Sequence, residues 1–599
     1  MSQGLDKREA MHEDGSKQQK PSFPQSARGL NFFDIDANLH LFLERAAPGL
    51  LQRWGEVLGR LGAFTGDRLD RQAEQSDQDF PPALVDLPDN RIAPTGRRNE
   101  IRLNREYEEC QQELYKSGIV AACFDKSVPE SHLLPFVAMY VVAQSDISTG
   151  CPFAMTHPTA YVLDRLAPQA VKDKYLPEIL RTDGETAICG TWATERHSGS
   201  DIGGTVTTAI KQDDGSYFLQ GHNWFTSAFG FKKFMGVKTA RVAGAPAGSK
   251  GLGLYLIPSH IDADWTVGNN LHVTHLKRKL GTRGLPTVEL DLQGALAYEI
   301  VPPGQGLKAM MTALGCSRAH NAMGAAGVMR RAYIESVCWA DNRETFGKKL
   351  IERPMVRKRI LDIAVQWMAG SALAFEAARG FDEAAKDYKK EPWMRIVTAL
   401  AKFRTAEQAV WCAQKALELV GGNGYTEDYA TARQFRDAMV LPVWEGPEQI
   451  QALELMRMIA GVEPGDRLFL EKIAAIRDGL PTAMNSEAIN LSALAGTMED
   501  SFTTLRADPQ KTELVADEFL RNMSDVLTYA LLCEEAAWAY IHKHDGTKLL
   551  VCRAYHARVW PGKFTVPSFS PDALLRNFNH IVQGEPISPV PGSNLELHP

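Results

Sequence analysis

The stretch VWEGPEQIQ, residues 443–451, joins a single apolar-flanked carboxylate to the start of a helix. Glu445 stands between Trp444 and Gly446, and a run with helical periodicity follows directly. The glycine lets backbone and ligand approach each other closely. Taken alone, the same stretch also describes a solvated surface turn, so its interpretation depends on segments elsewhere in the chain.

The bulk composition limits the class of protein. At 599 residues the chain is too long for one hydrophobic core, so several domains are expected. A net charge of -7 disfavours a nucleic-acid binder, and no apolar run is long enough to span a membrane. The nine cysteines form no CxxC pair and no Cys/His cluster at metal spacing. We therefore expect reduced thiols, a cytoplasmic location and no metal site.

Changes in hydrophobic period divide the chain into five parts. Apolar residues recur at helical spacing on both sides of a region in which residues 287–292 alternate strictly, as in a β-strand. Helices, then a β domain, then helices predict an α+β fold instead of a doubly wound sheet. The expected parts are a disordered tail (1–28), a helical domain (29–185), a β domain (186–300), a second helical domain (301–462) and an accessory helical domain with an extended Pro-rich end (463–599).

Two segments at the start of the β domain carry groups that suit a flat aromatic cofactor. Hydroxyls at Thr194 and Ser200, with Gly199 between them, form a loop that can hydrogen-bond to a polar ring or a pyrophosphate. Further on, Trp224 can stack on an aromatic ring while Thr226 bonds to its rim. A Ser/Gly surface turn and a buried core tryptophan are the structural alternatives.

Two later segments carry groups that suit phosphates. Arg343, in the run RETFGK (343–348), can donate charge-assisted hydrogen bonds, although a cationic helix C-terminus is equally ordinary. Gly421, Gly422 and Gly424 can bring backbone N–H groups onto a phosphate. Their loop follows a helical segment and lacks GxGxxG spacing, so it is not a Rossmann motif. Helix capping explains one of the glycines but not three.

Together and in this order, these segments resemble the acyl-CoA dehydrogenase family of flavoproteins over roughly residues 100–460. The resemblance implies an N-terminal helical domain, a middle β-barrel or sandwich domain and a C-terminal four-helix bundle, here with an extra C-terminal helical domain. It also implies FAD as the cofactor. By resemblance the FAD-binding residues are Trp192, Thr194, Gly199, Ser200, Trp224, Thr226, Arg343, Phe346, Gly421, Gly422, Gly424 and Gln449.

Length and detail resemble the AidB-like, alkylation-response branch of that family. The long N-terminal extension, Glu418, Trp444 and the extra C-terminal helices are the features that carry this likeness. Pro354 and Pro447 stand where many short-chain members have a flavin-contacting Gln and Thr. The resemblance therefore implies FAD binding without those two contacts.

The resemblance assigns Glu445 as the base that removes the α proton of an acyl-CoA thioester, while the β hydride passes to the flavin. An apolar wall that includes Trp444 should raise the pKa of this carboxyl group, which suits a general base. Some relatives carry the base on another helix, at the place that Ser317 occupies here. The implied substrate contacts are Ser200, Arg318, Trp444 and Gly446.

Three functions remain in competition. The first is an acyl-CoA dehydrogenase that passes electrons to an electron-transfer flavoprotein, as a homotetramer in fatty acid metabolism. The second is a flavin oxidase or monooxygenase on the same fold. The third is a DNA-associated alkylation-response protein with weak dehydrogenase activity, which should carry a basic accessory domain. Residues 461–599 hold 12 Lys+Arg against 18 Asp+Glu, which argues against DNA. Acyl chain length, branching and carrier stay open.

Overall fold

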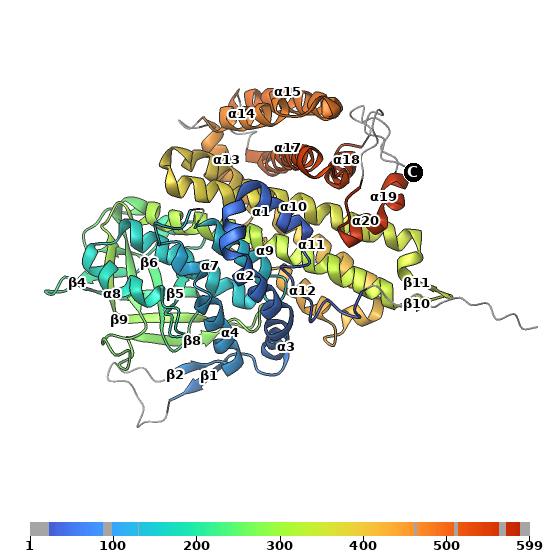
Figure 1. Ribbon diagram of the computed structural model, residues 1–599. Coiled ribbons are helices and arrows are strands. Elements are labelled where there is room, and N and C mark those ends of the chain that lie inside the picture. The colour runs from blue at the N-terminus through green and yellow to red at the C-terminus, as the bar shows by residue number, and fades with distance from the viewer. Residues whose placement is uncertain are drawn as a thin grey trace, which may run out of the picture.

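The computed structural model describes residues 23–87, 99–129, 131–460, 464–507, 513–561 and 571–587. Most of the predicted tail at 1–28 and of the Pro-rich end of the chain lies outside these residues. In the described part, a closed sheet lies at one end of a group of long helices, and a further layer of helices covers those helices (Figure 1). The fold is α+β, as the alternation of periods predicts.

The N-terminal domain is built mainly from helices. Helix α6 is buried along its whole length, and Asp146 caps the N-terminus of α7 by accepting from two backbone N–H groups. One correction applies: two short strands, β1 (Ala83–Asp86) and β2 (Asn99–Arg102), pair antiparallel within this predicted helical domain. Four-residue strands are too short to carry a period-2 signal. The helices are α1 (Ala37–Ala46), α2 (Pro48–Phe64), α3 (Asp70–Gln78), α4 (Arg105–Lys116), α5 (Ile119–Ala122), α6 (Leu133–Val142), α7 (Ile147–Leu166) and α8 (Gln169–Ile179).

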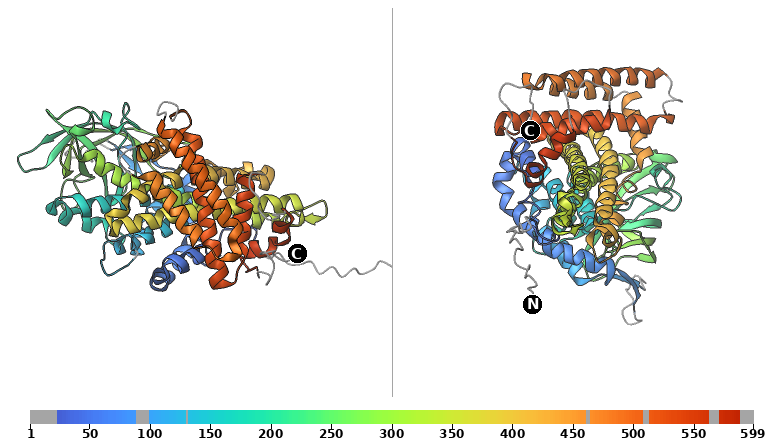
Figure 2. Two further views of the ribbon diagram at one scale, coloured as in Figure 1. Left: turned by 90° about the horizontal axis from the view of Figure 1, so that it is seen from above. Right: turned by 90° about the vertical axis from the view of Figure 1, so that its right-hand side faces the viewer.

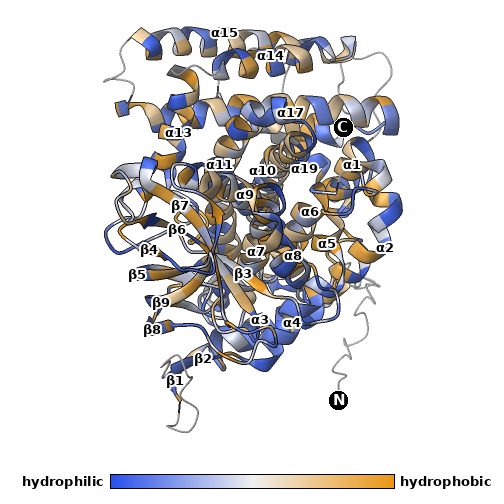
Figure 3. Cartoon of the chain, turned by 90° about the vertical axis from the view of Figure 1, so that its left-hand side faces the viewer, coloured by the Kyte–Doolittle hydropathy of each residue, from blue (hydrophilic) through white to orange (hydrophobic). Residues whose placement is uncertain are grey.

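The middle domain is a small barrel. Its ring runs β6-β4-β5-β9-β7 and closes where β6 pairs with β7, while β3 and β8 attach to β6 and β9. The turn at residues 213–216 joins β4 to β5, with Lys211 opposite Tyr217. Apolar residues dominate β3 and β7 in Figure 3, and every residue of β7 is buried. The strands are β3 (Ile188–Thr191), β4 (Thr208–Lys211), β5 (Tyr217–Ser227), β6 (Phe234–Val242), β7 (Leu252–Pro258), β8 (Leu271–Leu276) and β9 (Thr287–Val301).

Three long helices form the centre of the second helical domain. They are α9 (Gly306–Asn342), α10 (Pro354–Lys386) and α11 (Glu391–Val420). Two shorter helices, α12 (Ala430–Ala438) and α13 (Glu448–Ala460), complete it. By length and composition α10 is apolar enough to cross a membrane, but 94% of its most apolar window is buried among the other helices. It is therefore a core helix of the bundle.

The C-terminal helices cover one side of this bundle as two layers (Figure 2). Helix α17 packs on α10, α11 and α13, and α14 and α15 pack on α17 from outside. A buried ion pair of 2.6 Å joins Arg404 of α11 to Asp525 of α17. The helices are α14 (Gly465–Asp478), α15 (Asn485–Ala507), α17 (Ala516–Lys543), α18 (Thr547–Val559), α19 (Pro571–Arg576) and α20 (Phe578–Gln583).

Candidate active site

Glu445 lies in the turn between α12 and α13 and has an unusual backbone conformation. Its φ is +58°, and the next residue, Gly446, has φ +93°. The left-handed region is uncommon for a residue with a side chain, and it costs about 1–2 kcal/mol. Such strain persists only where the surroundings hold it, and it concentrates at functional sites. The predicted helix begins directly after the turn, at Glu448.

Three polar side chains from three helices hold the backbone of this turn. Arg318 Nε of α9 donates to the Glu445 carbonyl at 3.0 Å, and Gln451 Nε2 of α13 donates to the same carbonyl at 3.1 Å. Lys402 of α11 donates through Nζ to the carbonyls of Pro442 and Gly446. Buried donors thus satisfy the carbonyls of the turn and offset its strain.

The Glu445 carboxylate itself has one hydrogen-bond donor among the described residues. Ser317 Oγ donates to Oε2 at 2.6 Å. Burial raises the pKa of Glu445, and the hydrogen bond from Ser317 and the charges of Arg318 and Lys402 offset this only in part. A carboxyl group with a raised pKa binds a proton more readily near neutrality, as a general base must.

The cations beside Glu445 are also perturbed. Burial lowers the pKa of Lys402 to about 7; Glu445 opposes this shift and Arg318 adds to it. Burial likewise lowers the pKa of Arg318. Arg318 and Lys402 donate their hydrogen bonds to carbonyls of the turn and not to the Glu445 carboxylate. This arrangement leaves the carboxylate oriented by Ser317 and available to a ligand.

Glu445 lines a cavity of about 1880 Å³ between the barrel, α9, α11 and the turn before α13. Ligand sites for small molecules commonly have about 300–1,000 Å³, so this cavity has room for two bound groups. Seven of the residues predicted for the site line it together. They are Thr194, Gly199, Ser200, Arg318, Trp444, Glu445 and Gly446.

The end of β5 contributes other residues to the cavity than the predicted ones. Phe225 and Ser227 line the cavity, whereas the predicted Trp224 and Thr226 are not among its lining residues. Trp224 lies against Lys277, with Nζ 3.2 Å from its ring centroid, and Thr226 is buried. Successive side chains of a strand point to opposite faces, so a shift of one residue exchanges the whole set.

Trp192 is also outside the cavity lining. Its side chain is fully buried, its Nε1 donates to the Ser227 carbonyl at 3.1 Å, and its ring packs over Gly236. A side chain on Gly236 would meet that ring at 2.2 Å. Trp192 therefore stabilises the barrel, and its neighbours Thr191 and Ala193 line the cavity instead.

The remaining predicted residues lie away from Glu445. Arg343 and Phe346 follow α9, beside the strand pair β10 (Glu344–Thr345) and β11 (Lys348–Lys349), which lies at the opposite end of the bundle from the barrel (Figure 1). The glycines 421, 422 and 424 follow α11. The rings of Trp339, near the end of α9, and Tyr429, just before α12, pack edge to face with their centroids 5.7 Å apart. The ends of α9 and α11 are therefore close to each other. Phe346 is 97% exposed. Gln449, on α13, is exposed and does not line the cavity.

Several residues at the site were not predicted. Lys402, Asn321 and Gln451 hold the turn, and Lys279 lines the cavity. Burial lowers the pKa of Lys279 to about 8. A single lysine inside the apolar run IVTALAKF (396–403) is the pattern by which Lys402 is recognisable.

Three protein-family models match the chain in order. The adaptive response protein AidB N-terminal domain matches residues 23–185. The acyl-CoA dehydrogenase middle domain matches 190–295, and the acyl-CoA dehydrogenase C-terminal domain matches 304–460. These ranges follow the observed changes from helices to barrel to helices.

Individual proteins agree with the family models. The chain is 30% identical over 472 residues to acyl-CoA dehydrogenase family member 11 of Caenorhabditis elegans. The aligned region covers 76% of this chain and 75% of that protein. It is 28% identical to putative acyl-CoA dehydrogenase AidB of Escherichia coli, over 63% and 69% of the two chains. The crystal structure of Caenorhabditis elegans ACDH-11 in complex with C11-CoA has the same fold, with a TM-score of 0.79 at 24% identity over 91% and 94% of the chains. The chain belongs to the acyl-CoA dehydrogenase family, in its AidB-like branch.

Proposed function

We propose that this protein is an FAD-dependent acyl-CoA dehydrogenase that converts an acyl-CoA thioester to the trans-2-enoyl-CoA, with Glu445 as the base. The observation that carries the proposal is the strained turn that holds a carboxyl group of raised pKa in the wall of a cavity of about 1880 Å³. Structural buried acids collect several donors, whereas this one has only Ser317 among the described residues.

The residues in the cavity fit FAD. Hydroxyl groups of Thr191, Thr194 and Ser227 can bond to a polar ring, and Phe225 offers an apolar face. At the far end of the bundle, a Cβ on Gly421 or Gly422 would meet nothing within 4 Å, so their backbone is open to a phosphate. In a homotetramer those glycines would serve the cofactor of another subunit. When bound, FAD supplies the two-electron acceptor for the β hydride.

Glu445 would serve the substrate with two groups. Its carboxylate takes the α proton, so the acyl chain loses one proton to Glu445 and one hydride from the β carbon. Among the described residues no acceptor bonds to the Glu445 backbone N–H, which leaves it to polarise the thioester carbonyl. Presentation of this N–H and the carboxylate to one ligand would explain why the turn keeps a left-handed residue.

Lysines of the cavity lining suit the phosphates of CoA. Lys250 and Lys308 are exposed and come from separate elements, the turn before β7 and the start of α9. A cation near a phosphate contributes both attraction and orientation. ACDH-11, which shares the fold, forms a complex with C11-CoA, and this supports the same substrate class here. An electron-transfer flavoprotein is the proposed acceptor.

Anaerobic mixing of the flavin-loaded enzyme with acyl-CoA thioesters of increasing chain length tests the proposal. Wild type should bleach the flavin absorption with at least one thioester, and Glu445→Gln should bleach at least about 10³-fold more slowly. Glu448→Gln, three residues away at the start of α13, is the matched control and should bleach like wild type.

Two results would overturn the proposal. If none of the thioesters bleaches the flavin of the wild-type protein, the protein is not an acyl-CoA dehydrogenase. If the flavin of Glu445→Gln bleaches as fast as that of wild type, another residue is the base. The acceptor is tested separately, by turnover under air. Stoichiometric hydrogen peroxide would make the enzyme an oxidase.

A further inference from the structure

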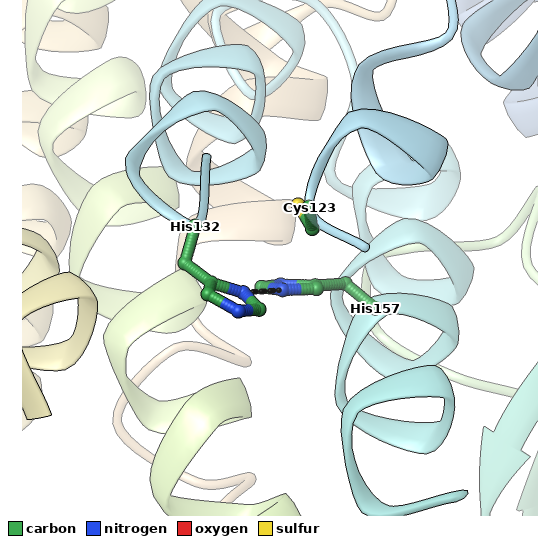
Figure 4. A group of neighbouring side chains, drawn as sticks. All are labelled: Cys123, His132 and His157. Atoms are coloured by element: carbon green, nitrogen blue, oxygen red, sulfur yellow. Dashed lines mark hydrogen bonds between the residues drawn. The ribbon is translucent and has the colours of Figure 1, made fainter. Parts of the chain in front are cut away.

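A second cluster of reactive side chains lies in the N-terminal helical domain, outside the Glu445 cavity. It consists of Cys123, which follows α5, His132, which precedes α6, and His157 in the middle of α7. Figure 4 shows the two imidazole rings pointing at each other, with the cysteine beside them. None of the three lines the cavity around Glu445. Spacing along the sequence predicts no such cluster, because the third member comes from a different helix.

The distances suit a metal ion. One ligand atom from each of Cys123, His132 and His157 lies within 4.8 Å of the other two, and His132 Nδ1 is 3.2 Å from His157 Nε2. A tetrahedral zinc ion, with bonds of about 2.0–2.1 Å to nitrogen and about 2.3 Å to sulfur, separates its ligands by about 3.3–3.6 Å. The nitrogens are already near that separation, and Cys123 Sγ reaches the third ligand position by giving up its contacts with the carbonyls of Ile119 and Ser131.

The surroundings fix the ligands and exclude competing ones. The rings of Phe124 and Tyr161 pack edge to face on His132, and the ring of Phe136 does so on His157. Asp382, on α10, accepts a hydrogen bond from the His132 backbone N–H at 3.2 Å and so holds the start of α6 in place.

Two cations near His132 oppose a bound ion, but both are engaged. Lys386 forms an ion pair of 2.6 Å with Asp382, and Arg165 bonds to the Tyr161 hydroxyl. The soft thiol and two imidazoles favour zinc over magnesium or calcium, which prefer oxygen ligands.

His157 has a second set of neighbours on its other nitrogen. Its Nδ1 lies 3.0 Å from His320 Nε2 and 3.6 Å from Cys316 Sγ, both on α9. That group is buried on all sides, whereas His132 is only half-buried and opens a path for an ion from solvent. His157 belongs to both groups. When an ion binds beside Cys123 and His132, the other nitrogen of His157 keeps its hydrogen bond with His320.

We propose that Cys123, His132 and His157 bind one zinc-class divalent ion. Binding replaces the thiol proton of Cys123, which is released to solvent, by a bond from the thiolate sulfur to the metal. The ion ties the segment between α5 and α6 to α7 and stabilises the N-terminal domain. This role does not depend on the dehydrogenase reaction at Glu445.

The test begins with the complete, flavin-loaded protein after dialysis against a chelator and titration with zinc alone. Mass spectrometry of the metal should give about one ion per chain, and zinc X-ray absorption should show one sulfur near 2.3 Å and nitrogens near 2.0–2.1 Å. Cys123→Ser should lower zinc affinity by at least about tenfold. Cys316→Ser, which removes a buried thiol beside the other nitrogen of the same histidine, should leave the affinity unchanged.

Three results would overturn the proposal. Wild type that retains no zinc has no site. A zinc X-ray absorption spectrum without a sulfur ligand would exclude Cys123 as a ligand. Loss of binding in Cys316→Ser but not in Cys123→Ser places the ion between α7 and α9. His132→Gln is the second variant, because it keeps a polar side chain at a half-buried position if Cys123→Ser fails to fold.

Discussion

Glu195, which is buried, and Glu445, which is half-buried in the cavity wall, differ in the number of donors around them. Glu195, in the loop after β3, accepts from the backbone N–H groups of Val206 and Thr207, from the Thr207 hydroxyl and from Lys238 at 3.2 Å. Burial alone would raise its pKa, but Lys238 and these bonds outweigh burial and hold the pKa below its ordinary value. Glu445 has one donor among the described residues, Ser317, and its pKa is raised.

The difference separates a structural anion from a base. Around Glu445 the cations bond to backbone carbonyls, so their hydrogen bonds shape the turn without neutralising the carboxylate. Around Glu195 the cation and the donors bond to the carboxylate itself. A buried charge that is fully paired stabilises the fold, whereas one that is left underpaired is available for chemistry.

The largest expected effect is the loss of activity when Glu445 is replaced. Glu445→Gln should lower kcat by about 10³-fold, because the amide cannot accept the α proton. The melting temperature should change little, because the amide can keep the bond to Ser317. Steady-state kinetics with an acyl-CoA and thermal unfolding are the two measurements. A large loss of stability with only a small loss of kcat would make Glu445 structural.

Glu195→Gln should instead lower the stability of the fold and change kcat little. It leaves Lys238, which is fully buried, without a counter-charge, so the free energy of unfolding should fall by about 3 kcal/mol. Because the pKa of Glu195 is lowered on folding, its contribution is present above its ordinary pKa and is lost as pH falls through the folded value. Urea unfolding from pH 7 to pH 3 should therefore show a flatter acid dependence in the variant. Equal stability of the two proteins at pH 7 would contradict the comparison.

Ser317→Ala removes the hydroxyl that donates to the Glu445 carboxylate. Loss of a hydrogen bond to a charged group, worth about 1.5–3 kcal/mol, should raise the pKa of Glu445 by about 1–2 units. A base must be ionised, so the acid limb of the kcat/KM profile should move to higher pH by that amount. Ser336→Ala, which removes a buried hydroxyl of the same helix that bonds to the Ala332 carbonyl outside the cavity, should leave the limb in place. An unmoved limb in Ser317→Ala would show that this bond does not set the pKa.

The smallest expected effect tests the backbone of the turn. Gly446→Ala places a Cβ 2.9 Å from Gln451 Nε2 and 3.0 Å from the Ile450 side chain, at φ +93°. The strain should cost about 1–2 kcal/mol of unfolding free energy and displace the carboxylate. We expect a lower kcat with an unchanged acid limb, measured beside Gly496→Ala on α15, where a Cβ meets nothing within 4 Å and which is outside the cavity. A shifted limb would mean that the turn sets the pKa.

Much of the fold was predictable, because its signals are local. The period change from helix to strand marks the barrel, and the start of α13 follows directly from the run after Pro447. The hairpin of β1 and β2 was missed, since its strands are four residues long. At β5 the prediction chose Trp224 and Thr226, and the neighbours Phe225 and Ser227 face the cavity. Strand register depends on partners and a bulge between residues 223 and 226 that composition does not report.

By itself the sequence determined the order of domains, the position of Glu445 beside Gly446 and the presence of the loop at Thr194, Gly199 and Ser200. These follow from residue chemistry and short-range spacing. Only the tertiary structure decided which charges face which groups: that Lys402 bonds to the turn, that Ser317 touches the carboxylate, and that Cys123 meets His157. Burial and the direction of each hydrogen bond set these pKa values, and both arise from contacts between helices far apart in the chain.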